Sequence, residues 1–327
     1  MNPSKKLASF TVSISLIAGF CLMANPATQE TDSTGDQVFR IQVGMVSLPV
    51  VVTNGKGEYV TDLSKEDFYV FDNGKPQKIA GFATVEEPVS VALMLDSSGS
   101  MEAHLRTIQN EAIRFVSFLK RDDGLAILSF ADDVVLWEPF SLYNKKNPMT
   151  IRRIEAKGLS AVYEAVWLAL EQVLKHEFGR KALVLFSDGI DTRSQTVTEE
   201  ETLDLARRTE VTIYCICFNP GKSRFKLFPF PGGGGEKKAE YAAGREYLMK
   251  LSGYSGGILV DAKKTDDLSS AFRKIARELS SQYSLGYYPS NTKHEGKYRK
   301  VDVKVTRPGL YVQTRPGYFE PNDKKKK

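Results

Sequence analysis

Long apolar runs that alternate with amphipathic segments constrain the fold of this chain more than any other feature. Val89–Leu95 is a continuous apolar run, which is typical of a strand buried on both faces. Similar runs occupy Lys181–Phe186 and Val211–Phe218, and segments with helical spacing of apolar residues separate them. The expected helices include Ala161–His176, Thr198–Arg208, Tyr241–Leu251 and Leu268–Ser281. This alternation predicts an α/β fold, with a doubly wound, mostly parallel sheet covered by helices on both faces.

The segments on either side of the α/β region are β-rich. Residues 37–87 contain alternating apolar residues and two turn signals, and residues 282–319 return to the same pattern. Each segment is too short to bury much apolar surface alone. We therefore expect 37–87 and 282–319 to pack together as one β module, with a domain of residues 88–281 inserted between its halves.

The first residues have the pattern of a targeting segment. Lys5 and Lys6 precede an apolar stretch from Leu7 to Met23, and a polar segment follows. This order is typical of a secretory signal peptide, with an uncleaved N-terminal anchor as the alternative. We expect residues 1–29 to direct export to a periplasmic or extracellular location, with membrane attachment only through an uncleaved leader.

The positive charge of the chain lies at its two ends. The formal net charge is +5. Lys5, Lys6 and the four lysines of a basic tail, residues 320–327, account for all of it, and the rest of the chain is near neutrality. A nucleic-acid binder would carry its charge as a patch on the fold, so no nucleic-acid partner is expected.

Two cysteines, Cys215 and Cys217, lie outside the leader. They are two residues apart on an expected strand, so their side chains share one face in a geometry that is poor for a disulfide. We expect both to be small buried residues of a core strand.

Oxygen-bearing side chains gather where the apolar strands end. Asp96, Ser98 and Ser100 follow the first buried strand. Asp188 follows the second apolar run, and Ser160 stands at the start of a helix. Ligands of open α/β sheets bind outside the carboxyl ends of the strands, so we expect these five residues to form one site.

The five expected site residues offer only oxygen donors, namely two carboxylates and three hydroxyls. Such a set suits Mg²⁺, Mn²⁺ or Ca²⁺ rather than copper or zinc, which prefer nitrogen and sulfur. Mg²⁺ fits best because it keeps waters and takes one or two carboxylates. An open coordination position would then favour an Asp or Glu carboxylate from a partner protein. Asp191 is expected to bond its own loop instead of the metal.

Three motifs resemble the loops of the von Willebrand factor type A domain. They are Asp96-Ser97-Ser98-Gly99-Ser100, Gly158-Leu159-Ser160-Ala161-Val162-Tyr163 and Ser187-Asp188-Gly189. In that family these loops form the metal-ion-dependent adhesion site, and the resemblance covers about Pro88–Ser281. It implies a Rossmann-like domain whose metal ligands are Asp96, Ser98, Ser100, Ser160 and Asp188. The family usually has threonine where this chain has Ser160, and the hydroxyl is retained.

The flanking β segments also resemble those of a bacterial subgroup of exported proteins with such a domain. The predicted function is that of an exported, non-enzymatic module that binds a partner protein through a divalent cation. One alternative is a metal-assisted or serine-type hydrolase, for which His104 is the candidate general base near Ser100. The other alternative is a scaffold whose metal site is purely structural.

Overall fold

The computed structural model describes residues 44–84, 86–142, 148–219, 233–291 and 295–320. The expected leader, residues 1–29, lies outside the described residues, as does the expected basic tail beyond Glu320. Within the described part of the chain, no helix combines the length and apolar character needed to cross a bilayer.

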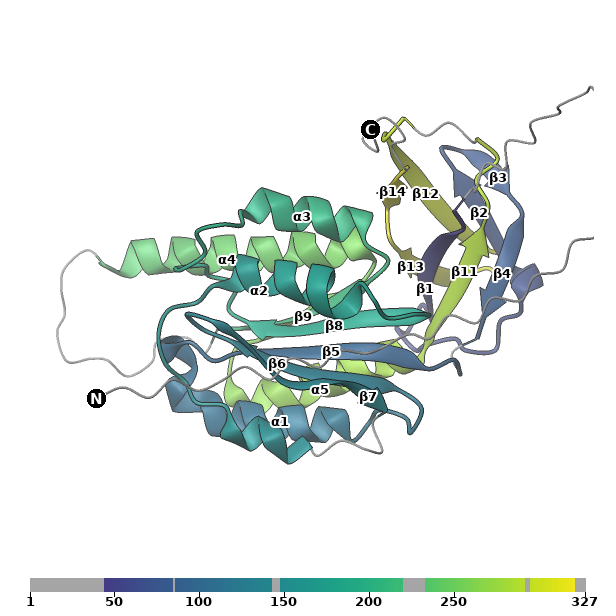
Figure 1. Cartoon of the computed structure of the whole chain (residues 1–327). Helices are drawn as coiled ribbons and strands as arrows, with labels where there is room; N and C mark the ends of the chain where they lie inside the picture. Colours follow the sequence, from purple (N-terminus) through teal and green to yellow (C-terminus); the bar gives the residue numbers. More distant parts are fainter. Residues whose placement is uncertain (1–43, 85, 143–147, 220–232, 292–294, 321–327) are drawn as a thin grey trace, which may run out of the picture. The chain divides into compact units, whose positions relative to one another are not determined.

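A six-stranded sheet forms the centre of the α/β region (Figure 1), in the order β10-β9-β8-β5-β6-β7. Its strands are β5 (Val89–Asp96), β6 (Gly124–Phe130), β7 (Val134–Leu142), β8 (Arg180–Ser187), β9 (Thr212–Phe218) and β10 (Leu259–Ala262). All neighbours are parallel except β7, which pairs antiparallel with β6 at the edge. The predicted doubly wound, mostly parallel sheet is confirmed.

The strand order reverses between β5 and β8. After β5 the chain adds β6 and β7 on one side, and it then crosses over to add β8, β9 and β10 on the other. Because β5 and β8 are parallel neighbours, with Leu95 opposite Phe186, they end at the same edge of the sheet. This reversal is the point at which open α/β sheets bind their ligands.

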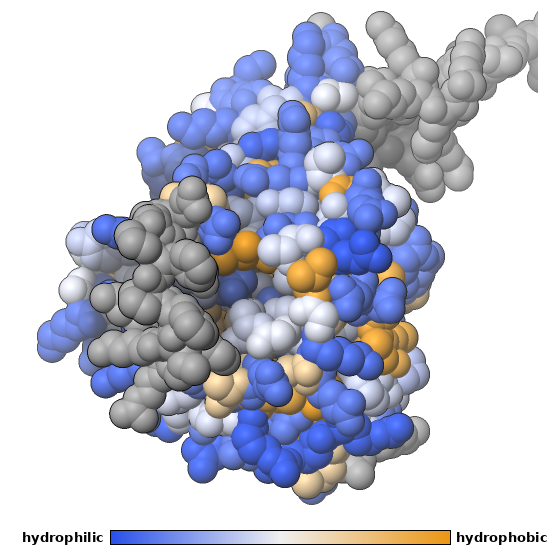
Figure 2. All heavy atoms as spheres, turned by 90° about the vertical axis from the view of Figure 1, so that its left-hand side faces the viewer, coloured by the Kyte–Doolittle hydropathy of each residue, from blue (hydrophilic) through white to orange (hydrophobic). Residues whose placement is uncertain are grey.

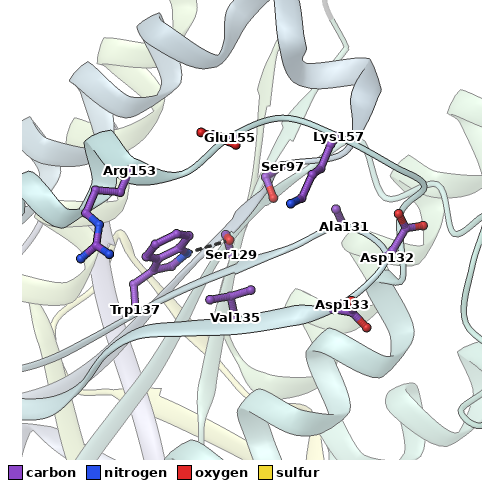
Figure 3. Close-up of a pocket in the computed structure, with 10 residues that line it drawn as sticks. All are labelled: Ser97, Ser129, Ala131, Asp132, Asp133, Val135, Trp137, Arg153, Glu155 and Lys157. Atoms are coloured by element: carbon purple, nitrogen blue, oxygen red, sulfur yellow. Dashed lines mark hydrogen bonds between the residues drawn. The ribbon is translucent and has the colours of Figure 1, made fainter.

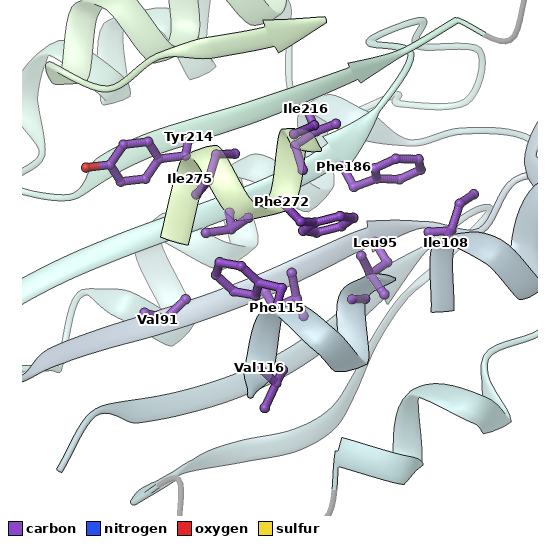
Figure 4. Packing of buried hydrophobic residues seen from close by; sticks show 14 of the residues in the cluster. Val91, Leu95, Ile108, Phe115, Val116, Phe186, Tyr214, Ile216, Phe272 and Ile275 are labelled. Carbon is purple, nitrogen blue, oxygen red and sulfur yellow. The ribbon is translucent and has the colours of Figure 1, made fainter. Parts of the chain in front are cut away.

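Helices cover both faces of the sheet (Figure 1). They are α1 (Leu105–Val116), α2 (Val162–Leu168), α3 (Glu199–Arg208), α4 (Gly233–Ser255) and α5 (Thr265–Ser280). Successive side chains of β5 point to opposite faces, so Leu93 packs in a cluster with α1 and α5, whereas Met94 packs with α2, α3 and α4. Figure 4 shows the first cluster, in which the ring of Phe272 lies 5.8 Å from that of Phe115 and 6.1 Å from that of Phe186.

Both cysteines are free and buried in β9, as predicted. Burial raises the pKa of the Cys217 thiol to about 12. The thiols therefore stay protonated and serve as small apolar side chains.

Several short elements differ from the sequence expectation. The expected helix Ala161–His176 is α2 followed by a π-helical stretch, Ala169–Leu174. Two 3₁₀ segments, Gly99–His104 and Pro148–Arg153, had no periodic signal because they are too short to show one. α4 begins at Gly233, eight residues before the start of the expected helix Tyr241–Leu251.

Two four-stranded sheets contain strands from both flanks of the α/β region. The strands are β1 (Val46–Asn54), β2 (Phe68–Asp72), β3 (Lys75–Gln77), β4 (Ile79–Ala83), β11 (Gln282–Tyr287), β12 (Tyr298–Val305), β13 (Leu310–Thr314) and β14 (Gly317–Phe319). β1 lies between β11 and β13 in one sheet, and β2 pairs with β12 in the other. Val50, Val70, Tyr283 and Val303 belong to one apolar cluster that both sheets share.

Buried polar side chains join these two sheets to the α/β region. The Glu278 carboxylate of α5 accepts hydrogen bonds from the Tyr59 hydroxyl at 2.6 Å and from the Gln313 amide at 2.8 Å. The Arg180 guanidinium at the start of β8 donates to the carbonyl oxygens of Glu87, at 2.8 Å, and Leu279, at 2.6 Å. The chain therefore enters and leaves the α/β region beside one guanidinium group.

Candidate metal centre

Asp96, the last residue of β5, accepts hydrogen bonds from three different loops. Its carboxylate is fully buried. The Ser98 hydroxyl donates to Oδ1 at 2.6 Å, and the Ser187 hydroxyl donates to Oδ2 at 2.7 Å. The Ser160 hydroxyl approaches Oδ2 at 3.4 Å. One carboxylate is thus the centre of the arrangement.

Asp188 joins the same group through Ser100. The Ser98 and Ser100 hydroxyl oxygens lie 3.1 Å apart, and the Ser100 hydroxyl donates to the Asp188 carboxylate. Asp188 also accepts a hydrogen bond from the backbone amide of Ile190 at 3.0 Å. The structure therefore brings the five residues expected from the sequence together at the carboxyl edge of the sheet.

Backbone hydrogen bonds fix the three loops to one another. The Gly99 amide donates to the carbonyl oxygen of Gly158 at 3.0 Å, which ties the first loop to the second. The second and third loops exchange two bonds, because Thr192 donates its amide to the Ser160 carbonyl at 2.8 Å and accepts the Ser160 amide on its hydroxyl at 2.9 Å. The loops that carry Ser98, Ser100 and Ser160 are thus tied to one another.

Gly189 lets the third loop pass close to α4. Its φ is +78°, in the left-handed region that favours glycine. A Cβ at this position would overlap the carbonyl oxygen of Gly244 in α4. The close approach of these two backbones seats Asp188 at the edge of the sheet.

The two carboxyl groups share a buried environment. Burial, helped by the charge of Asp96, raises the pKa of Asp188 to about 7. Burial also raises the pKa of Asp96, against the effect of hydrogen bonds from Ser98 and Ser187. The main influences on both pKa values include no basic side chain. Burial thus disfavours the charged form of both carboxyl groups, and a cation bound between them would favour the ionised form.

The donor set fits a hard divalent cation. Carboxylate and hydroxyl oxygens are the ligands that Mg²⁺, Mn²⁺ and Ca²⁺ prefer. Across the described residues, no three His, Cys, Asp or Glu side chains group closely enough to hold a metal by themselves. Any ion at this edge would depend on the serine hydroxyls as well as on Asp96 and Asp188.

Ser187 is a residue of the site that the sequence analysis missed. Its hydroxyl donates to Asp96 and accepts the Gly189 amide at 2.9 Å, so it orients the carboxylate of β5 from the end of β8. Its position directly before Asp188 in the third motif was the available signal. The sequence alone could not show that β5 and β8 are neighbours.

Asp191 bonds its own loop, as predicted. Its carboxylate accepts the Ser194 hydroxyl at 2.6 Å and the Ser194 amide at 2.9 Å. It also accepts the Tyr163 amide at 3.1 Å, which connects the third loop to the first turn of α2.

His104, the candidate general base of the hydrolase alternative, contacts an aromatic ring. Its ring packs edge-on against the ring of Phe218, with 5.3 Å between centroids. The hydrogen bonds of Ser100 run to Ser98 and Asp188 instead. The geometry gives no support to the serine-type hydrolase alternative.

A cleft of about 590 Å³ borders the first loop (Figure 3). The Trp137 indole donates to the Ser129 hydroxyl at 2.9 Å within it, and the Arg153 guanidinium lies 5.5 Å from the centre of the Trp137 ring. Lys157 is tied to the first loop, because its amide donates to the Ser97 carbonyl at 2.9 Å. Figure 2 views the side on which β5 and β8 end, where a few hydrophobic residues lie beside a hollow in a mostly hydrophilic surface.

Comparison with known protein families bears on the fold. Residues 90–227 match the family model of the von Willebrand factor type A domain. This part of the chain is a von Willebrand factor type A (VWA) domain. A comparison with curated protein sequences gave no match.

Several solved structures resemble this chain. BatB from Bacteroides thetaiotaomicron is 19% identical, with a TM-score of 0.44, and the match covers 59% of this chain and 97% of BatB. A von Willebrand factor type A protein from Catenulispora acidiphila is 11% identical, with a TM-score of 0.47 and coverage of 79% and 74%. Proximal thread matrix protein 1 from the mussel byssus, solved with a zinc-occupied MIDAS motif, is 16% identical with a TM-score of 0.48. That match covers 64% of this chain and only 49% of the mussel protein.

Proposed function

We propose that this chain is an exported, non-enzymatic module that binds a partner protein through a divalent cation, with Mg²⁺ as the preferred ion. The residues that would hold the ion are Asp96, Ser98, Ser100, Ser160 and Asp188. An Asp or Glu carboxylate of the partner would take the open coordination position. The observation that carries the proposal is a buried pair of carboxyl groups that accept hydrogen bonds from serine hydroxyls. The groups that most affect the pKa values of this pair include no basic side chain.

Each residue has a distinct part in this proposal. Asp96 and Asp188 supply the negative charge. Ser98 and Ser187 hold Asp96 in a fixed orientation, and Ser100 connects the two carboxylates. The ion, when bound, supplies a positive charge that a carboxylate outside the chain can meet. Because burial holds the pKa of Asp188 near 7, ion binding displaces a proton from part of the population at neutral pH.

A metal titration tests the proposal directly. Mg²⁺ and Mn²⁺ are titrated calorimetrically into the chain from residue 30 onward and into its Asp96→Asn and Asp188→Asn variants. We expect saturable binding by the parent chain and a loss of at least about tenfold in both variants, because each removes one of two charged ligands. Asp122→Asn is the matched control, since Asp122 is exposed in the loop between α1 and β6.

The role of the ion in partner binding needs a separate measurement. A partner captured from the periplasm or medium should be released by EDTA and rebound on addition of Mg²⁺. A purely structural metal would leave capture indifferent to the chelator once the protein is folded, and that outcome would refute the proposed role of the open position. Ion binding that is equally strong in both Asn variants would refute the site itself.

A further inference from the structure

A groove of about 740 Å³ lies between α2, α3 and the turn that joins β6 to β7. We propose that this groove binds a cationic segment of a partner protein that also carries apolar side chains. The inference stands apart from the metal centre, because none of the five candidate metal ligands lines the groove.

The groove offers apolar surface to a ligand. Its apolar lining residues are Val134, Ala161, Trp167, Leu168, Val197 and Leu205. The Trp167 side chain is 38% exposed, and Leu205 is only partly buried. When an apolar residue of a partner packs against this partly exposed tryptophan and its aliphatic neighbours, water is released from both apolar surfaces.

The charged lining of the groove is strongly acidic. It comprises Asp132, Asp133, Glu164, Glu201, Asp204 and one cation, Arg208. Arg208 is already paired with Asp204 at 2.7 Å, and Arg193, next to the lining, lies 3.9 Å from the Asp132 carboxylate. Hydrogen bonds from the Gln195 and Thr196 amides lower the pKa of Glu164, so its charge persists below neutral pH. The groove therefore presents an excess of negative charge next to apolar surface.

Charge complementarity decides which occupant fits. Nucleic acid and anionic lipid would be repelled by the carboxylates. A small metal ion would leave the apolar surface uncovered. The chain's own residues 324–327 are all lysine, and they lack an apolar side chain for that surface. A partner segment in which Lys or Arg alternates with apolar residues satisfies both parts of the lining.

The groove is continuous with the second loop of the candidate metal centre. Ala161, which lines the groove, directly follows Ser160, and its amide donates to the Ala131 carbonyl at 3.0 Å. The Asp132 carboxylate accepts the amide of Leu159, in the same loop, at 3.1 Å. A partner bound at the loop could therefore run on into the groove.

A peptide titration tests this inference with the full chain. The probe is the synthetic peptide Leu-Lys-Lys-Leu-Lys-Lys-Leu, and its counterpart with Glu in place of Lys is the charge control. The chain has two tryptophans, so a Trp137→Phe background makes Trp167 the sole tryptophan whose fluorescence is followed. We expect a saturable change of Trp167 fluorescence with the lysine peptide and none with the glutamate peptide. EDTA should leave the affinity unchanged, which separates this site from the proposed metal function.

Two charge reversals locate the binding. Asp133→Lys should weaken binding of the lysine peptide about five- to tenfold, because it replaces an attractive charge at the groove with a repulsive one. Asp122→Lys, the same change at an exposed position outside the groove lining, should leave the affinity unchanged. Equal losses in the two variants would mean nonspecific attraction and would overturn the proposal. A chain ended after Glu320 that binds the peptide much more tightly would also overturn it, because its own lysines would then be the occupant.

Discussion

Ser187 illustrates how much one hydroxyl contributes at the scale of single residues. It donates to the buried Asp96 carboxylate and accepts an amide from the next loop. Ser187→Ala should lower the free energy of unfolding by about 1–3 kcal/mol, because it leaves a buried charged acceptor short of one donor. The same change should weaken Mg²⁺ binding about tenfold or more, since it removes a group that orients a ligand.

Urea unfolding and metal titration measure the two effects of Ser187→Ala. Ser141→Ala, at an exposed position of β7, serves as the matched loss of a hydroxyl and should change neither quantity. Metal affinity that survives unchanged in Ser187→Ala would show that Asp96 needs no support from β8.

Gly189 and Gly179 give a paired prediction about backbone geometry. Both have positive φ, +78° and +71°, so alanine is strained at either position. Alanine at 179 meets no atom within 4 Å and should cost about 1 kcal/mol, whereas alanine at 189 also overlaps the backbone of α4. We expect Gly189→Ala to cost at least about 3 kcal/mol and to weaken metal binding. Equal shifts of the thermal midpoint in the two variants would contradict a special role for the close approach.

At the scale of elements, the stability that the Glu278 contact between α5 and the β-rich segments contributes should depend on pH. Burial raises the pKa of Glu278 above its ordinary 4.5, although hydrogen bonds from Tyr59 and Gln313 oppose the shift. The folded state thus favours the protonated carboxyl. This contribution to stability is complete below about pH 4.5 and is lost as pH rises through the folded pKa.

Glu278→Gln should therefore become more stable relative to the parent chain as pH rises. Glutamine keeps an oxygen and an amide for the same neighbours but cannot ionise. Urea unfolding at about pH 4.5 and about pH 8 measures the gap between the two proteins. Glu200→Gln, on the exposed face of α3, should show no such trend. If Glu278→Gln instead lost stability relative to the parent chain as pH rises, the raised pKa of Glu278 would be contradicted.

At the scale of the whole molecule, both flanks of the VWA domain contribute strands to the same sheets. β1 comes from before the domain, and its neighbours β11 and β13 come from after it. We propose that residues 44–87 and 282–320 form one folding unit with the VWA domain inserted in it. Because Arg180 bonds carbonyl groups at both junctions, the two halves come close together at that point.

A truncation series tests this arrangement. Residues 44–87 and 282–320 joined by a short Gly-Ser linker should fold cooperatively, whereas either half alone should not, because β1 would lose its partners on both sides. Circular dichroism and amide dispersion in NMR spectra report the outcome. Two halves that are each stable alone would disprove the proposed insertion.

Sequence alone was sufficient for the class of fold, and it indicated that five oxygen-bearing residues would lie at one edge of the sheet. Runs such as Val89–Leu95 are buried on both faces, so their character shows in local composition, and residues that end such strands must lie at one edge of a parallel sheet. The three motifs could be identified from the sequence because each lies within a few consecutive residues.

Only the tertiary structure decided which of these local pieces became neighbours. The support of Asp96 by Ser187 depends on β5 and β8 lying side by side, and the acidic groove depends on α2 and α3 meeting the turn after β6. These contacts join residues far apart in the chain, and neither periodicity nor a short motif encodes them. Their geometry follows from burial of both faces of the sheet, which is settled when the whole chain packs.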